Sequence, residues 1–201
     1  MGQDCGSRSG QRGFSMLEML VVIAIIMVIA AMAIIQLQPA LQTNRAAAAA
    51  AQLKSALRQG REAAIASRRT VQVQFFTGAP CSVNTACVVL TRLDPPANVP
   101  TVILTLPLEG SVQFAQFAGE TDTPDLFGNG APIFFGGVAN GPPTMEFQSD
   151  GSFTNGTGGV INGTVFLGIP TFRSSARAIT ILGGTGRIHS YRCPSNTACV
   201  Y

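Results

Sequence analysis

The sequence predicts an α+β protein, with one long N-terminal helix packed on a C-terminal antiparallel β-rich domain. Three observations support this fold class. Residues 19–44 carry no charged side chain, residues 40–69 are rich in alanine, and from residue 70 onward apolar and polar residues alternate between glycine and proline clusters. The first two patterns are typical of helix and the third is typical of strands. A chain of 201 residues has room for one or two modest domains.

The apolar run LVVIAIIMVIAAMAII (20–35) predicts a membrane-spanning helix. About 20 such residues cross the hydrocarbon core of a bilayer, and a helix satisfies the backbone groups that lipid cannot. Arg8 and Arg12 precede the run, so the positive-inside rule places the N-terminus in the cytoplasm. A secretory signal peptide is the alternative, with AAMA (30–33) as its cleavage site.

After Pro39 the sequence ALQTNRAAAAAAQLKSALRQGREAAIASRR (40–69) is predicted to continue as a helix, because Ala, Gln, Leu and Arg favour that conformation. Its apolar side chains recur at three- and four-residue spacing, at Leu53, Ala56, Leu57, Ala64 and Ile65. This half is therefore amphipathic, and we expect its apolar stripe to pack on the β-rich domain. Because Pro39 removes one helical hydrogen bond, a bend is predicted there.

Beyond Thr70 the apolar residues recur with a period of two, which predicts strands. The predicted strands are 71–75, 88–93, 101–106, 112–117, 145–148, 164–169, 176–182 and 186–192. ILGGTGRI (181–188) is predicted to form the last hairpin, and the glycine-rich stretch 118–143 is expected to be a long irregular loop.

The five cysteines comprise Cys5 and two similar clusters, CSVNTAC (81–87) and CPSNTAC (193–199). An even number of cysteines in short loops suggests disulfides and an oxidising compartment. Three pairings of Cys81, Cys87, Cys193 and Cys199 are open, and within-cluster pairing is favoured because short loops close easily. A zinc site is the alternative, although five intervening residues exceed the usual spacing of zinc ligands.

Motifs of an enzyme are missing from the sequence. It contains no P-loop, HExxH or GxSxG pattern. Its one histidine, His189, is followed by Ser190, but successive residues of a strand point to opposite faces, so the two side chains would not meet. A net charge of +3 is too mild for a general polyanion-binding protein. We therefore expect no enzyme activity, no cofactor, no bound metal and no small-molecule substrate.

The stretch RGFSMLEML (12–20), with the apolar run that follows, resembles the class III signal of type IV pilins and type II secretion pseudopilins. The rest of the chain resembles the GspH/FimT family of minor pilins. That likeness rests on three segments: REAAIASRRTVQV (61–73), MEFQSDGSF (145–153) and ARAITILGGTGRI (176–188).

This resemblance implies that a prepilin peptidase cleaves between Gly13 and Phe14 and that Phe14 becomes N-methylated. Glu18 would then pair with the Phe14 amine of a neighbouring subunit during assembly. The partners implied are the peptidase, inner-membrane lipid before assembly, and other pilins or pseudopilins. An ordinary glutamate ahead of a plain membrane anchor is the alternative interpretation of Glu18.

The resemblance also implies a domain organisation. Residues 1–13 would be a cleaved leader, 14–38 a transmembrane and filament-core helix, 39–69 its amphipathic continuation, and 70–201 a periplasmic pilin head. The expected function is that of a minor subunit, near the tip of a type II secretion pseudopilus or a type IV pilus.

A second function is implied by FimT-like minor pilins that take up DNA through a basic C-terminal motif. The matching stretch here is GRIHSYR (186–192), in which His189 replaces an arginine of that motif. The candidate DNA-binding residues are Arg187, His189, Arg192 and Arg177. A solvated edge strand whose charges prevent aggregation is the alternative interpretation of this stretch.

Overall fold

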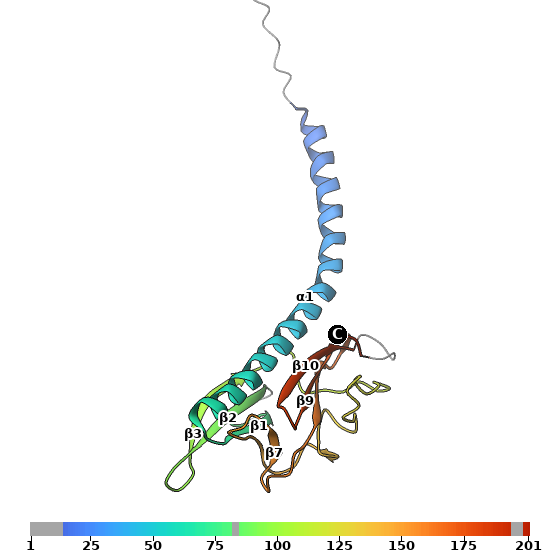
Figure 1. Cartoon of the computed structure of the whole chain (residues 1–201). Helices are drawn as coiled ribbons and strands as arrows, with labels where there is room; N and C mark the ends of the chain where they lie inside the picture. Colours follow the sequence, from blue (N-terminus) through green and yellow to red (C-terminus); the bar gives the residue numbers. More distant parts are fainter. Residues whose placement is uncertain (1–13, 82–84, 194–198) are drawn as a thin grey trace, which may run out of the picture. The chain divides into compact units, whose positions relative to one another are not determined.

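The computed structural model describes residues 14–81, 85–193 and 199–201 (Figure 1). It confirms the predicted fold class, because one long helix, α1 (Met16–Ser67), is followed by antiparallel sheets. Contacts divide the chain into two compact units, Met1–Ala40 and Leu41–Tyr201.

The first unit contains the N-terminal part of α1. All side chains from Phe14 to Ala33 are exposed. The helix is long and apolar enough to cross a membrane, as predicted. Pro39 lies inside α1 and does not end it, and the predicted bend stays a prediction.

In the second unit the remainder of α1 presents a buried stripe to the sheets. Its fully buried apolar residues are Ala46, Ala49, Ala50, Leu53, Ala56, Leu57 and Ala64. Most of this stripe was predicted, but Ile65 was placed on it wrongly, since its side chain is 42% exposed. Gly60 is buried beside the stripe, and a Cβ there would lie 3.2 Å from Leu90 Cδ1. The small residues therefore allow the helix to approach the sheet closely.

The helix ends in a left-handed turn. Arg68 has a φ of 52°, and the Arg69 amide donates a hydrogen bond of 3.1 Å to the Ala64 carbonyl. This is the six-to-one bond of a Schellman cap, which satisfies a terminal helix carbonyl and reverses the chain toward the first strand.

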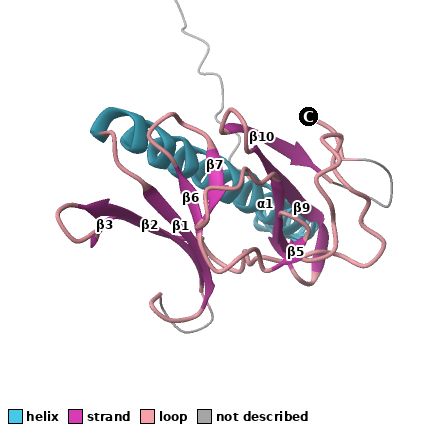
Figure 2. Cartoon of the chain, turned by 60° about the horizontal axis from the view of Figure 1, so that its bottom comes forward, coloured by secondary structure: helices cyan, strands magenta, loops and turns pink. Residues whose placement is uncertain are grey.

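Two five-stranded antiparallel sheets follow (Figure 2). The first has the order β3-β2-β1-β6-β7 and consists of β1 (Val71–Thr77), β2 (Ala86–Asp94), β3 (Val99–Pro107), β6 (Met145–Phe147) and β7 (Phe153–Asn155). The second has the order β10-β9-β8-β4-β5 and consists of β4 (Ile133–Phe135), β5 (Val138–Ala139), β8 (Gly163–Ile169), β9 (Phe172–Leu182) and β10 (Arg187–Arg192).

Seven of the eight predicted strands are confirmed, as is the last hairpin, in which Leu182 pairs with Arg187. The strand predicted at 112–117 is wrong. That segment makes a single bridge, from Gln113 to Gly168, because the rest of this edge of β8 is paired with Pro132 and β4. Three short strands were missed: β4 and β5, which lie inside the expected loop 118–143, and β7.

One core joins α1 to both sheets. Its largest buried side chains include Leu53 and Leu57 from the helix and a group of phenylalanines. The ring centroids of Phe147 and Phe153 are 4.8 Å apart, and those of Phe135 and Phe153 are 5.5 Å apart. These rings come from both sheets, so aromatic packing fixes the two sheets against each other.

Candidate functional site

The N-terminal end of α1 carries one acidic side chain on an apolar surface. Phe14 precedes the helix and is 75% exposed, and Glu18 lies in the first turn. A carboxylate there interacts favourably with the positive end of the helix dipole. No described residue forms an ion pair with Glu18. Gly13, on the other side of the predicted cleavage site, lies outside the described residues.

The surface of α1 before and after Glu18 is apolar on all sides. The exposed large side chains are Met16, Leu17, Met19, Leu20, Val21, Val22, Ile23, Ile25, Ile26, Met27, Val28, Ile29 and Met32. Soluble monomers rarely expose so large a continuous apolar area. Lipid or other apolar helices must therefore cover this part of α1.

The comparisons with known proteins bear on this end of the chain. The sequence profile of the prokaryotic N-terminal methylation motif matches residues 8–34. The chain carries a type IV pilin-like prepilin signal. This signal implies processing by a prepilin peptidase and assembly with other pilins, and the apolar helix is consistent with a single-pass inner-membrane anchor. No curated protein and no solved structure matches the chain significantly.

The pilin-like signal points to a structural subunit rather than an enzyme. His189, the one histidine, lies in a hydrogen-bond network. Its Nδ1 atom lies 3.2 Å from the Asp125 carboxylate and 3.2 Å from the Tyr191 hydroxyl, while its buried Nε2 has no partner among the described residues. The Thr180 and Tyr191 hydroxyls both donate to the Asp125 carboxylate.

The Asp125 network was not predicted, because Asp125 lies in the segment 118–143 that was expected to be irregular. Burial opposes the ionisation of Asp125, but hydrogen bonds from Thr180, Tyr191 and His189 outweigh it and hold the pKa of this carboxyl below its usual value. Burial and hydrogen bonds with Tyr201 and Asp125 raise the pKa of Tyr191. The network therefore holds an ionised Asp125 and a neutral Tyr191 at neutral pH.

Both cysteine clusters form internal disulfides in the second compact unit, Leu41–Tyr201, which is called the head unit from here on. Cys81 is bonded to Cys87, and Cys193 is bonded to Cys199, which is the within-cluster pairing that short loops favour. The first bond spans the turn between β1 and β2, and the second follows β10. Because zinc binds thiolates and these sulfurs are oxidised, the paired clusters do not form the zinc site that was the alternative.

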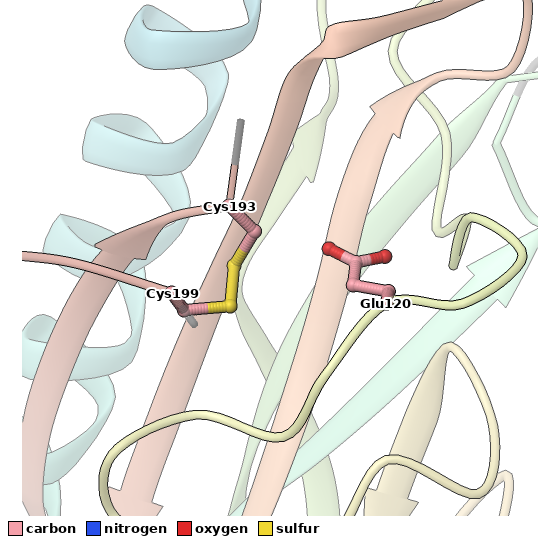
Figure 3. A group of neighbouring side chains, drawn as sticks. All are labelled: Glu120, Cys193 and Cys199. Atoms are coloured by element: carbon pink, nitrogen blue, oxygen red, sulfur yellow. A yellow bond between two sulfur atoms is a disulfide. The ribbon is translucent and has the colours of Figure 1, made fainter. Parts of the chain in front are cut away.

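Glu120 lies beside the second disulfide (Figure 3). Its carboxylate oxygen and the sulfurs of Cys193 and Cys199 lie within 4.8 Å of one another. One carboxylate oxygen accepts a hydrogen bond of 2.8 Å from the Phe117 amide, and the other has no partner among the described residues. Burial raises the pKa of Glu120. With the disulfide intact, Glu120 is a buried carboxylic acid next to two oxidised sulfurs, and the three side chains do not form a set of metal ligands.

The structure divides the four candidate DNA-binding residues into two pairs. Arg187 is exposed and His189 is half-buried, and they share one face of β10. Arg177 and Arg192 are directly opposed on β9 and β10. Arg177 is only 6% exposed, and burial lowers its pKa. Its guanidinium donates to the Ser174, Ala176 and Thr43 carbonyls, so it is not free to contact phosphate.

A cationic groove lies between α1 and β10 in the head unit. Its volume is about 550 Å³, and its charged lining residues are Lys54, Arg58, Arg61 and Arg187, with His189 at one end. The three helix cations are spaced i, i+4 and i+7, which places them on one side of the helix. Sequence reasoning identified Arg187 and His189 but missed the helix cations as their neighbours.

Proposed function

We propose that this chain is a minor pilin or pseudopilin of the GspH/FimT type. The observation that supports the proposal most strongly is the prepilin signal, matched over residues 8–34, which leads directly into a helix that is apolar and exposed on all sides. A long helix whose second half packs on antiparallel sheets suits such a subunit. The head would be periplasmic, and the apolar helix would move from lipid into a filament core.

Processing supplies the group that Glu18 lacks in the single chain. Hydrolysis of the Gly13–Phe14 peptide bond frees the Phe14 amine, which is then N-methylated and remains cationic. Two opposite charges 4 Å apart attract by about 4 kcal/mol at an effective dielectric constant of 20. A lone carboxylate within the bilayer costs about 2.5 to 3.5 kcal/mol on insertion scales. Pairing Glu18 with the amine of a neighbouring subunit would therefore favour assembly and set the register between subunits.

The role of the subunit is proposed to be structural, in a short filament of a type II secretion system or a type IV pilus. We propose that the subunit lies near the tip of that filament. Apolar packing along α1 supplies most of the adhesion in this proposal, and the Glu18 pair selects one alignment among many.

The experiment compares Glu18→Ala with Glu62→Ala in a strain that assembles the filament. Both glutamates are exposed on α1, but Glu62 lies in the head unit. We expect Glu18→Ala to accumulate in the membrane and to be lost from sheared filaments, while Glu62→Ala assembles normally. Normal incorporation of Glu18→Ala would contradict the proposed role of Glu18 and favour a plain membrane-anchored binding module.

DNA binding is the second candidate function, and the cationic groove is the observation that favours it. Its support is weaker, because Arg177 is buried against backbone carbonyls. A shift of single-stranded DNA by the full chain at low salt, abolished by Arg187→Ala, would support this function. If the full chain does not shift single-stranded DNA at low salt, DNA binding is excluded as a function.

A further inference from the structure

The cationic groove between α1 and β10 carries an excess of positive charge. Lys54, Arg58 and Arg187 form no ion pair with any described residue, and no carboxylate occurs among the described residues that line the groove. Arg61 uses one nitrogen to donate a hydrogen bond of 3.2 Å to the Gly151 carbonyl and has others left. Like charges that face one groove repel each other, so an anionic occupant would be stabilised there.

The second wall of the groove is the outer edge of a sheet. β10 is the last strand in its sheet, with β9 on its inner side. The Cys193 amide donates to the Ala176 carbonyl of the β9 side, and bonding alternates along an antiparallel pair. The odd-numbered residues of β10 therefore form their backbone hydrogen bonds with β9. The backbone groups of Arg192, Ser190 and Ile188 point away from β9, toward the outer edge of the sheet.

The chain itself shows that this edge accepts a strand. Arg192 exchanges two backbone hydrogen bonds with Val200, of 2.7 and 2.8 Å, in an antiparallel bridge. At the next two outward positions, Ser190 and Ile188, no described residue provides such a backbone partner. Open donors and acceptors on an edge strand are a template for a further extended segment.

Space for such a segment continues along the strand. A second cavity of about 260 Å³ shares Lys54 with the groove and borders β10 at Ser190 and Arg192. Its helix wall consists of Ala47, Ala50 and Ala51, whose short side chains leave room beside the strand. The two cavities together follow β10 over its whole length.

We propose that this groove binds an extended, acidic segment of another polypeptide, which adds as a strand to the outer edge of β10. Main-chain hydrogen bonds to Ser190 and Ile188 would hold the segment, and its carboxylates would face Lys54, Arg58 and Arg187. Strand addition gives affinity through the backbone and selectivity through alternate side chains. The open backbone edge favours a peptide over a nucleic acid, which has no matching series of amide donors and acceptors. The proposal does not depend on the filament function, because every residue it uses lies in the head unit.

The test uses the full chain in detergent and fluorescence polarisation of a labelled eight-residue peptide, in which glutamate alternates with threonine or valine. A peptide with glutamine in place of glutamate tests charge. Two N-methylated versions, one modified on the glutamates and one on the intervening residues, test backbone pairing, because only one of these two sets of amides can face β10. A labelled twelve-residue oligo-dT tests the nucleic-acid alternative.

We expect the acidic peptide to bind and the glutamine peptide to bind more weakly. One N-methylated peptide should lose binding and the other should keep it. Arg58→Ala should weaken binding about two- to fivefold, since an exposed ion pair contributes that much. Arg45→Ala is the matched control, because Arg45 is exposed on the same helix and does not line the groove.

Three results would overturn the proposal. Binding of both N-methylated peptides with unchanged affinity would mean that only charge holds the segment. Binding of oligo-dT but not of the peptide, with loss in Arg58→Ala, would make the groove a nucleic-acid site. No binding of the acidic peptide at low salt, by a chain with both disulfides intact and a native circular dichroism spectrum, would leave the groove without the proposed ligand.

Discussion

The Tyr191 hydroxyl donates a hydrogen bond of 2.9 Å to the Asp125 carboxylate and so ties β10 to the segment that precedes β4. Thr180 donates to the same oxygen from β9. One partly buried carboxylate thus connects two strands of the second sheet to a stretch that has little secondary structure of its own. The hydroxyls of Tyr191 and Tyr201 lie 3.0 Å apart and extend the network to the end of the described chain.

Removal of this acceptor should destabilise the head. Asp125→Ala leaves the Thr180 and Tyr191 hydroxyls without their acceptor, and we expect the free energy of unfolding to fall by about 1 to 3 kcal/mol. Tyr191→Phe removes one donor and should have the smaller effect. Thermal unfolding of the full chain in detergent, followed by circular dichroism, measures both. An unchanged midpoint in Asp125→Ala would show that the network contributes nothing.

Glu120 should have a pH-dependent effect on stability. Its pKa is raised in the folded state above the ordinary value of 4.5, so the folded protein favours the protonated acid. Protonated Glu120 therefore stabilises the fold relative to the ionised form. This stability is fully present below pH 4.5 and is lost as the pH rises through the folded-state pKa. We expect Glu120→Gln to raise the unfolding midpoint at pH 8 more than at pH 4. A gain that is equal at both pH values would contradict this.

Gly186 should tolerate no side chain. Its φ is +61°, and an added Cβ would lie 2.1 Å from the Gly151 carbonyl oxygen. Left-handed backbone costs an alanine about 1 kcal/mol, and overpacking costs about 1 to 3 kcal/mol, so we expect Gly186→Ala to lose about 2 to 4 kcal/mol. Gly184 is the matched control in the same hairpin, since a Cβ there meets no atom within 4 Å. Equal stability of the two variants would argue against the tight hairpin.

The two disulfides can be tested by alkylation and by stability. Intact mass after alkylation without reduction should show Cys81, Cys87, Cys193 and Cys199 unmodified, and peptide mapping should recover Cys81 with Cys87 and Cys193 with Cys199. Loss of either bond, in a paired Cys→Ala variant, should lower the free energy of unfolding by about 2 kcal/mol for so short a loop. Bonds between the clusters would contradict the structure.

Local sequence patterns predicted much of this fold, because the forces behind them are local. A charge-free run over residues 20–35 can only be a lipid-compatible helix or a buried one, and period-two alternation marked the long strands. The missed strands β4, β5 and β7 are two or three residues long, too short to show a period. The wrong strand at 112–117 has a strand-like pattern, but β4 pairs with most of the β8 edge that this segment would need.

The site was predictable where it depends on neighbouring residues and hidden where it depends on tertiary structure. Glu18 and the cleavage motif lie within one short segment and could be identified directly. The pairing of His189 with Asp125 joins residues 64 positions apart, and no sequence spacing reveals it. The spacing of Lys54, Arg58 and Arg61 was visible in the sequence, but their position opposite β10 follows from how the helix packs.

The most direct test of the central claim is the N-terminal sequence and intact mass of the chain after coexpression with a prepilin peptidase. A catalytically inactive peptidase is the control. The pilin-like account predicts a product that begins at Phe14 and carries one added methyl group, formed only with the active enzyme. An unprocessed chain, or one cleaved after Ala31 or Ala33, would contradict it, because the apolar run would then be a simple anchor or an export signal.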